Sequence, residues 1–331
     1  MGVDTNFIGQ TGLEISQLGF GAASIGGMSN AVPLDEARAA IETSVKRGVT
    51  HFDTAPFYGH GLSERLIGDG LRNVENFVLS SKVGRILTPG APLDSGGWVN
   101  PFPFTPAFDY SYDGIMRSYE DSLQRLGLDH IDILYLHDIG NYTHGETDGP
   151  GMFETAMNGG YKALDELRSS GAISAIGIGV NEAAVCEAAL DRGEWDLFML
   201  AGRYTLLEQD SALSLLAKCT VHGTDIVIAG PFNSGVLVGG DSYNYEAVPR
   251  DIADKVRKIQ RVCESHNVDM ASAALQFPLA HAAVKSTLPG PRTPVEVTQI
   301  HNWWNQSIPT SLWSDLKQEG LLHLDADVAE E

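Results

Sequence analysis

Eight short apolar segments alternate with longer amphipathic stretches along almost the entire chain. The apolar segments predict strands at residues 18–20, 50–53, 77–82, 131–137, 175–180, 197–201, 225–229 and 283–288. Helical periodicity fills most of the gaps, at residues 34–47, 62–71, 112–126, 153–169, 182–190 and 251–266. A strand followed by a crossover and a second strand is typical of a parallel sheet covered by helices. An open doubly wound sheet and a closed barrel both fit this rhythm. The count of eight strands and their even spacing favour a (β/α)8 TIM barrel, with residues 1–331 forming a single domain.

Three segments outside this rhythm have predicted positions in such a barrel. The turn at residues 9–12 (GQTG) predicts a short N-terminal hairpin that closes the bottom of the barrel. Long loops at residues 86–111 and 138–152 follow the third and fourth strands, on the face where barrel enzymes build their sites. Because the loop at 86–111 is rich in aromatic residues, we expect it to form a pocket wall. The alternative is that it caps the barrel or contacts another subunit.

Composition narrows the range of partners. The formal net charge is −21, and such an acidic surface repels nucleic-acid backbones and anionic lipids. We therefore expect a small-molecule substrate, no nucleic-acid or membrane partner, and a monomer or small homo-oligomer. No secretory signal or long apolar span is visible. The three cysteines are widely spaced, which predicts neither a disulfide framework nor a metal site and fits a cytoplasmic protein.

Charged residues stand at the ends of three consecutive predicted strands. Asp53 ends the second strand, Lys82 the third and His137 the fourth, while Tyr58 follows in the loop after Asp53. A titratable residue at the end of a buried strand is costly unless it has a partner. Taken singly, Asp53 fits a turn cap, Lys82 a surface lysine and His137 a core histidine. Their shared position at successive strand ends favours one common site.

These four residues suit a proton-transfer site. A lysine cation beside a phenol favours the phenolate, so Lys82 is expected to lower the pKa of Tyr58 toward neutrality. Asp53 would hold Lys82 in place and keep it charged. His137 would donate a hydrogen bond to the substrate oxygen. The sequence therefore predicts acid–base chemistry with Tyr58 at its centre.

Four motifs resemble the signature of the aldo-keto reductase superfamily. They are residues 52–59 (FDTAPFYG), the pair Ser63 and Glu64 with Gly68, residues 81–83 (SKV) and residues 134–137 (LYLH). The resemblance extends from about residue 11 to about residue 299. It implies a (β/α)8 barrel that binds a nicotinamide cofactor without a Rossmann domain. It also implies a catalytic tetrad of Asp53, Tyr58, Lys82 and His137, with Tyr58 as proton donor or acceptor.

The resemblance also places a cofactor along the last strand-to-helix loops. The positions it implies are Asn181, Phe232, Ser234, Gly235, Gly290, Arg292, Glu296 and Gln299. Asn181 would contact the nicotinamide carboxamide. Family members that prefer NADP often place an arginine where this chain has Glu296, and a carboxylate there would repel a 2′-phosphate. Arg292 could instead pair with a 2′-phosphate, which would favour NADP. On balance NAD is expected rather than NADP.

Sequences around the fourth, sixth and seventh strands resemble one branch of the family. That branch includes L-fucose and D-threo-aldose 1-dehydrogenases and an aldo-keto-type pyridoxal 4-dehydrogenase, which oxidise cyclic hemiacetals to lactones. We therefore expect an NAD-dependent dehydrogenase, with Trp98 and Tyr204 contacting the substrate. A flat aromatic pocket would indicate pyridoxal. An NADPH-dependent carbonyl reductase and a non-enzymatic nicotinamide-binding subunit are the alternatives.

Overall fold

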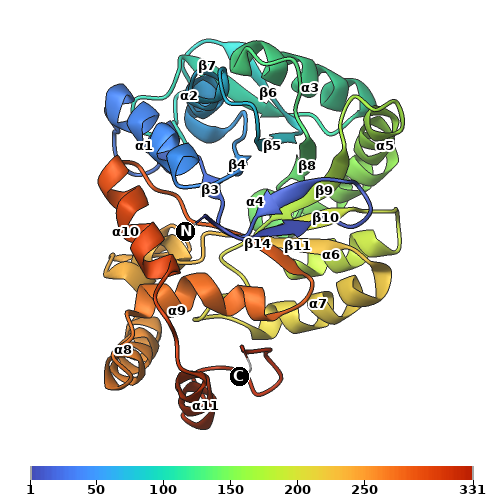
Figure 1. Cartoon of the computed structure of the whole chain (residues 1–331). Helices are drawn as coiled ribbons and strands as arrows, with labels where there is room; N and C mark the ends of the chain where they lie inside the picture. The colour runs from blue at the N-terminus through green and yellow to red at the C-terminus, as the bar shows by residue number, and fades with distance from the viewer. Residues whose placement is uncertain (1, 330–331) are drawn as a thin grey trace.

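The computed structural model describes residues 2–329, and eight parallel strands form the barrel at its centre (Figure 1). Their order in the sheet is β14-β11-β10-β9-β8-β5-β4-β3. The strands are β3 (Phe20–Gly21), β4 (His51–Asp53), β5 (Val78–Val83), β8 (Ile133–His137), β9 (Ala175–Val180), β10 (Leu197–Ala201), β11 (Asp225–Ala229) and β14 (Val284–Leu288). The predicted (β/α)8 barrel is confirmed, and all eight predicted strands are present.

The first and last strands meet where the chain closes on itself. Leu18 and Thr287 form a parallel bridge, and the amide of Gly19 donates to the carbonyl of Thr287 at 3.0 Å. A β-carbon on Gly19 would lie 2.1 Å from the side chain of Leu288. A larger residue at this position would therefore force the buried Leu288 side chain to shift where the two strands meet.

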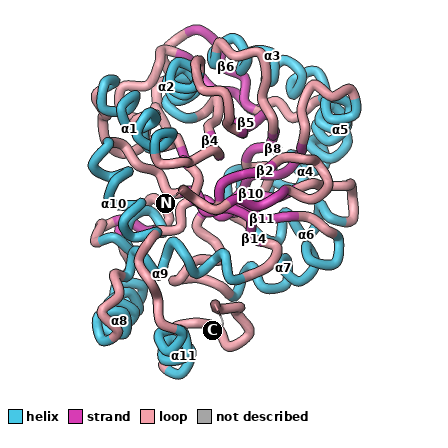
Figure 2. Tube along the Cα trace, viewed as in Figure 1, coloured by secondary structure: helices cyan, strands magenta, loops and turns pink. Residues whose placement is uncertain are grey.

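Helices surround the barrel (Figures 1 and 2). They are α1 (Leu34–Lys46), α2 (Leu62–Leu71), α3 (Tyr112–Leu126), α5 (Tyr161–Ser169), α6 (Ala183–Leu190), α7 (Asp210–His222), α8 (Arg250–Ser265), α9 (Met270–Gln276), α10 (Pro294–Trp304) and α11 (Thr310–Gln318). The main hydrophobic core lies between these helices and the outer face of the sheet. Within the described part of the chain, no helix is both long enough and apolar enough to cross a bilayer.

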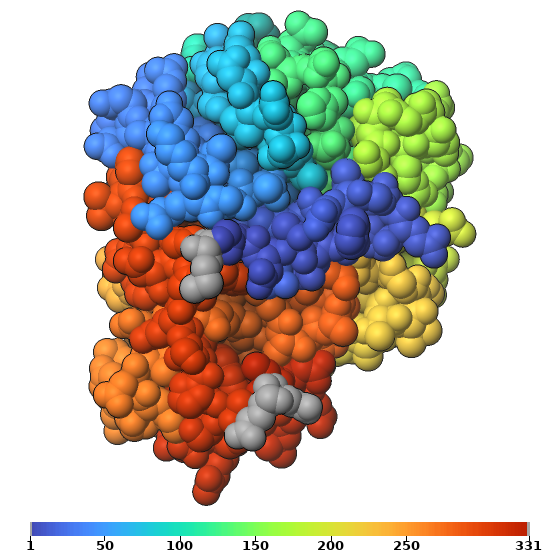
Figure 3. Space-filling view, viewed as in Figure 1, coloured from blue at the N-terminus to red at the C-terminus, as the bar shows by residue number. Residues whose placement is uncertain are grey.

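The N-terminal hairpin covers one end of the barrel, as predicted (Figure 3). It pairs β1 (Thr5–Phe7) with β2 (Glu14–Ser16). Ile8 and Ile15 are fully buried against interior residues of the barrel. The amide of Gly9 donates to the carboxylate of Asp225, at the start of β11, at 2.7 Å. The hairpin therefore seals the end opposite the strand termini that carry the predicted site.

Two predicted loops contain secondary structure. Residues 138–152 were expected to form a loop, but α4 (Asn141–Thr155) occupies most of this segment and continues through a π-helical turn (Ala156–Gly160) into α5. Helical periodicity is hidden there because Gly145, with φ of 72°, interrupts the helix and Pro150 lies within it. The loop at 86–111 carries a hairpin of β6 (Arg85–Pro89) and β7 (Phe104–Phe108). Both segments lie at the end of the barrel where β5 and β8 terminate.

Candidate active site

The fold brings the four predicted catalytic residues to one end of the barrel. Asp53 ends β4, Lys82 is the penultimate residue of β5, and His137 ends β8. These strands are consecutive neighbours in the sheet. Tyr58 begins the short helix η2 (Tyr58–Gly61) that follows β4. Asp53, Lys82 and His137 are 3%, 2% and 6% exposed, so their charges and hydrogen bonds act in a dry environment.

Asp53 and Lys82 form a buried ion pair beneath Tyr58. The Lys82 ammonium lies 2.6 Å from Asp53 Oδ2 and donates to the carbonyl of Thr54 at 2.9 Å. The Ser80 hydroxyl donates to the other oxygen of Asp53 at 2.7 Å. Lys82 Nζ stands 4.6 Å from the centre of the Tyr58 ring. Every carboxylate oxygen of Asp53 thus has a donor, which offsets the cost of burying the charge.

Aromatic rings and His137 surround Tyr58. Its ring centre lies 5.9 Å from the His137 ring, with the planes nearly perpendicular, and 5.6 Å from Trp98. Trp98 belongs to the aromatic loop, is buried, and its indole nitrogen has no hydrogen-bond partner among residues 2–329. The structure therefore places the Trp98 ring beside that of Tyr58, and the predicted substrate contact of Trp98 stays a prediction.

The direction of the Tyr58 pKa differs from the prediction. Burial raises the pKa of Tyr58 well above its ordinary value, the negative charges of Asp53, Tyr245 and Asp138 raise it further, and Arg85 opposes them. Burial also lowers the pKa of Lys82, against the effect of Asp53. The predicted lowering by Lys82 is therefore wrong for the protein alone. The physical reason is that burial disfavours the phenolate, and that the negative charge of Asp53, which pairs with Lys82, disfavours it further.

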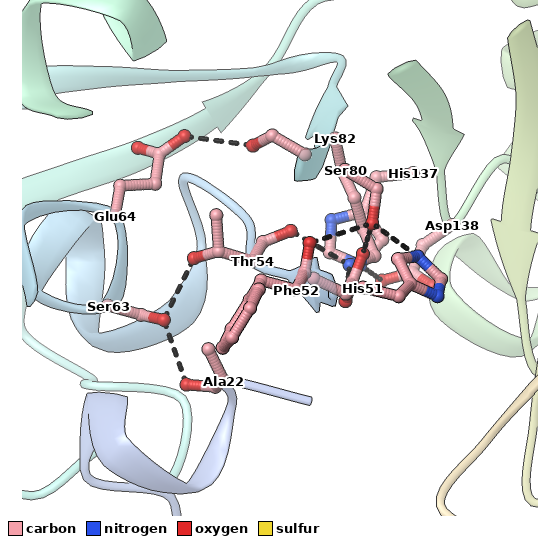
Figure 4. Close-up of polar contacts among 12 residues, drawn as sticks. Ala22, His51, Phe52, Thr54, Ser63, Glu64, Ser80, Lys82, His137 and Asp138 are labelled. Carbon is pink, nitrogen blue, oxygen red and sulfur yellow. Dashed lines mark hydrogen bonds and ion pairs between the residues drawn. The ribbon is translucent and has the colours of Figure 1, made fainter. Parts of the chain in front are cut away.

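Ser63 and Glu64 of the family motif form hydrogen bonds behind the tetrad (Figure 4). The Ser63 hydroxyl pairs with that of Thr54 at 2.8 Å and donates to the carbonyl of Ala22 at 2.8 Å. Glu64 accepts from Ser81 at 3.0 Å and from Arg125 at 2.5 Å. Ser63 and Glu64 therefore tie α2 to the strand ends that carry Asp53 and Lys82.

Below the ion pair, His51 is buried as a neutral group. Its Nδ1 lies 3.2 Å from Ser286 Oγ, and burial followed by the charge of Lys82 lowers its pKa to about 3. In the unfolded chain its pKa is about 6.5. Protons then favour the unfolded state, so this contribution to stability is present above pH 6.5 and is lost as the pH falls toward 3.

We expect His51→Gln to reduce the acid sensitivity of the fold. Between pH 7.5 and 5.5, urea unfolding should show the wild-type free energy of unfolding falling by about 1.4 kcal/mol more than that of the variant. Comparing only the change with pH removes the constant cost of the substitution. An identical pH dependence in the two proteins would show that His51 titrates normally in the folded state.

Comparison with known proteins identifies the family of this chain. The Aldo/keto reductase family model matches residues 17–319. The chain belongs to this family. The aldo/keto reductases are oxidoreductases that use a nicotinamide cofactor, and this chain shares their barrel.

Two relatives and one solved structure illustrate the similarity. The chain is 42% identical to a pyridoxal 4-dehydrogenase of Microbacterium luteolum, over 95% of this chain and 97% of the relative. It is 37% identical to a D-threo-aldose 1-dehydrogenase of a Pseudomonas species, over 94% and 96% of the two chains. The aldo-keto reductase AKR11C1 from Bacillus halodurans has the same fold, with a TM-score of 0.76, 23% identity and 99% of both chains covered. The branch predicted from the sequence is confirmed.

The residues expected to bind the aldo/keto reductase cofactor follow the ends of β9, β11 and β14. Asn181 follows β9 directly, and its amide donates to the carbonyl of Ala201 at 2.9 Å. Gly235 lies in the turn after β11, where a β-carbon would meet no atom within 4 Å. After β14, a β-carbon on Gly290 would lie 2.5 Å from Ser24 Oγ. This pairing of an open backbone surface with a glycine-dependent close approach fits a nicotinamide dinucleotide.

The far end of this surface carries an ion pair. The Glu296 carboxylate accepts from the backbone amide of Arg292 at 2.7 Å and lies 3.3 Å from its guanidinium. Thr293 caps the first turn of α10 by accepting from the amide of Glu296 at 3.2 Å. Gln299 lines an open hollow on the same helix. Phe232 packs against Trp303, with ring centres 5.9 Å apart. The Arg292 guanidinium is thus engaged by Glu296.

Sequence reasoning missed a hairpin whose tip reaches toward the site. It joins β12 (Ser242–Tyr243) to β13 (Glu246–Ala247), and the amide of Tyr245 at its tip donates to Ser234 Oγ at 3.1 Å. Tyr245 is 55% exposed, but burial of its hydroxyl raises its pKa, a hydrogen bond with Asn181 lowers it, and Asp138 raises it. Its hydroxyl therefore shares the environment of Tyr58. Asn244 and Tyr245 both have positive φ, which is the signal of a two-residue hairpin turn.

The structure does not support the predicted substrate contact of Tyr204. Its side chain is fully buried and packs against Phe277 and His281, with ring centres 5.2 and 5.9 Å away. Tyr204 also has φ of 53°, in the left-handed region. It is a core residue of the helical layer.

Within residues 2–329, no group of histidine, cysteine or acidic side chains is arranged to hold a metal ion.

Proposed function

We propose that this aldo/keto reductase is an NAD-dependent dehydrogenase that oxidises a cyclic hemiacetal to a lactone. The observation that carries the proposal is the placement of Tyr58 between the buried Asp53–Lys82 pair and His137. Two relatives, at 42% and 37% identity, are named as dehydrogenases, of pyridoxal and of D-threo-aldose. Both kinds of compound carry an aldehyde that closes onto an internal hydroxyl to give a hemiacetal.

In the proposed reaction Tyr58 and His137 share the hemiacetal hydroxyl. Tyr58 accepts the hydroxyl proton as the carbonyl forms, while His137 donates a hydrogen bond to the same oxygen. Asp53 holds the Lys82 ammonium against the Tyr58 ring. The phenol must be ionised before it can accept this proton, and accepting the proton returns it to the neutral phenol. When bound, oxidised nicotinamide supplies the hydride acceptor and a positive charge, which favours the phenolate form of Tyr58. The aromatic wall at Trp98 excludes water from the reacting atoms.

The ion pair after β14 supports NAD as the cofactor. Glu296 places a carboxylate in the first turn of α10 and occupies the guanidinium of Arg292. A ribose with free hydroxyls can donate hydrogen bonds to this carboxylate. A 2′-phosphate would meet like charge, and like charges in such an arrangement disfavour binding.

Removing that carboxylate should change the cofactor preference. We expect Glu296→Gln to shift the ratio of kcat/KM for NADP over NAD by about 10- to 100-fold toward NADP, or about 1.4–2.7 kcal/mol. Adding Arg292→Met should cancel most of the gain, because the freed guanidinium supplies the new phosphate contact. Glu319→Gln, at an exposed position beyond α11, is the control for net charge. An unchanged ratio in Glu296→Gln would contradict the cofactor assignment.

The substrate class is tested directly by following reduced nicotinamide. The protein should reduce NAD with pyridoxal or with aldoses such as L-fucose, and the product should be a lactone. Pyridoxal is the first substrate to test, because Tyr58, Phe57 and Trp98 form an aromatic cluster beside the site. Oxidation of NADPH by simple aldehydes, without hemiacetal oxidation, would instead show a carbonyl reductase. Tight cofactor binding without turnover on any of these compounds would show a binding subunit.

A further inference from the structure

An arginine that the family motifs do not include contacts the candidate catalytic histidine. Arg85 begins β6, three residues after Lys82, and is only 5% exposed. One guanidinium nitrogen lies 2.6 Å from His137 Nδ1. The other lies 2.7 Å from the carboxylate of Asp138. Arg85 therefore bridges the histidine and the acid that follows it in the chain.

The surroundings fix the plane of this guanidinium. Its central carbon lies 4.2 Å from the ring centre of Phe57 and 4.8 Å from that of Phe108. Stacking between two rings leaves only the edges of the guanidinium free to donate hydrogen bonds. Those edges face His137 and Asp138. One guanidinium nitrogen is therefore directed at His137 and the other at Asp138.

The backbone beside His137 is held equally firmly. The Tyr110 hydroxyl lies 2.7 Å from the carbonyl of His137 and 3.0 Å from that of Asp138. Asp138 has φ of 55°, a conformation uncommon for residues other than glycine. Its amide donates to the carbonyl of Gly179 at 3.0 Å. A strained backbone secured by these contacts keeps the Asp138 carboxylate on Arg85.

These contacts determine the protonation state of His137. A guanidinium has five N–H donors and no acceptor, so His137 Nδ1 must present its lone pair to Arg85. The proton of the neutral ring then resides on Nε2, which also lies 3.4 Å from Asp138 Oδ2. We propose that Arg85 is a positioning residue that holds His137 as the neutral Nε2–H tautomer, ready to donate to the substrate oxygen. The inference rests on the proposed function only for the identity of that oxygen.

The charges around His137 favour the same state. The titratable groups that act on it or contact it are Lys82 on β5, Arg85 on β6, Asp138 after β8 and Tyr58 on η2. Asp53 on β4 pairs with Lys82, and His144 on α4 contacts the Tyr110 hydroxyl. Burial lowers the pKa of His137 well below its ordinary value, and the positive charges of Arg85 and Lys82 lower it further. A neutral donor stabilises the substrate oxygen without competing with Tyr58 for its proton.

The test compares two substitutions of Arg85 by nuclear magnetic resonance of 15N-histidine-labelled protein. In the wild type we expect the His137 signals, assigned by their loss in His137→Gln, to show a neutral Nε2–H ring from pH 5 to pH 8. Arg85→Met removes the donor, so the Nδ1–H tautomer should appear beside the Nε2–H form. The pKa of His137 should also rise, although burial and Lys82 still keep it below its ordinary value. Arg85→Gln keeps an uncharged donor and should retain the tautomer. Neutral Nδ1–H histidine in the wild type, or a ring that stays entirely Nε2–H in Arg85→Met, would overturn the proposal.

Turnover gives a second reading with a matched control. We expect Arg85→Met to lower kcat about 10- to 100-fold, because His137 is no longer held with its proton on Nε2. The loss of the neighbouring positive charge should also move the acid limb of the pH profile upward, while cofactor affinity changes little. Arg85→Gln should recover most of this loss. Arg168→Met removes a partly buried arginine that pairs with Asp165 and Asp196 outside the site, and it should leave the pH profile unchanged. The spectra are recorded without substrate, so they test the role of Arg85 even where the proposed reaction is wrong. Loss of the expected turnover with unchanged spectra would point to the reaction rather than to Arg85.

Discussion

Replacing Tyr58 by phenylalanine should lower kcat by about 10²- to 10⁴-fold, the usual value of a positioned acid or base. The phenol is the group that lies against Lys82 and His137, so its hydroxyl is the one that the proposed reaction requires. Phenylalanine keeps the ring and its contact with Trp98. The affinity for NAD should therefore stay within about twofold, since only a transition-state interaction is removed.

The measurement is single-turnover reduction of NAD, together with a fluorescence titration of cofactor binding. Tyr112→Phe is the matched control, because its hydroxyl bonds to Glu166 on the surface at 2.8 Å. That variant should turn over within about twofold of the wild type. Comparable turnover in Tyr58→Phe and Tyr112→Phe would remove Tyr58 from the reaction.

Breaking the buried ion pair should have the largest effect on stability. Lys82→Met leaves Asp53 buried without its cation, which typically costs about 3–5 kcal/mol. Burial already raises the pKa of Asp53, and without Lys82 the carboxyl group can avoid its unpaired charge only by taking up a proton. The loss in unfolding free energy should therefore be larger at pH 8 than at pH 5. Turnover should fall in parallel, because Lys82 supports Tyr58.

A double variant separates the two effects. Adding Asp53→Asn to Lys82→Met leaves no unpaired charge, so urea unfolding should show a smaller loss than the sum of the single variants. Turnover should not return. Arg192→Met, which breaks an exposed pair with Glu154, should cost less than about 1 kcal/mol. Additive losses in the double variant would mean that Asp53 and Lys82 contribute independently.

The barrel and the positions of the tetrad could be predicted because they follow from periodicity and strand ends. Asp53, Lys82 and His137 each lie at or next to the last residue of a strand, and the order of parallel strands brings such ends together. The helix in residues 138–152 escaped detection since Gly145 and Pro150 disguise its period.

The contacts of individual side chains could not be predicted in the same way. Arg85 reaches His137 only because β6 folds back over the strand end, and nothing in the local sequence shows this. Tyr245 reaches Asn181 from a hairpin between β11 and α8. The pKa of Tyr58 depends on burial, which the sequence pattern does not quantify. These features depend on tertiary geometry rather than on spacing.

Closure of the barrel through Gly19 and Thr287 has a consequence for synthesis on the ribosome. The strand near residue 20 is among the first to leave the ribosome, but its partner in the closed barrel, residues 284–288, is made near the end. Until then both outer strands of the growing sheet present unpaired backbone groups to other chains. Nascent chains should therefore depend on chaperones late in translation, and truncation before residue 284 should give aggregation rather than a smaller folded barrel.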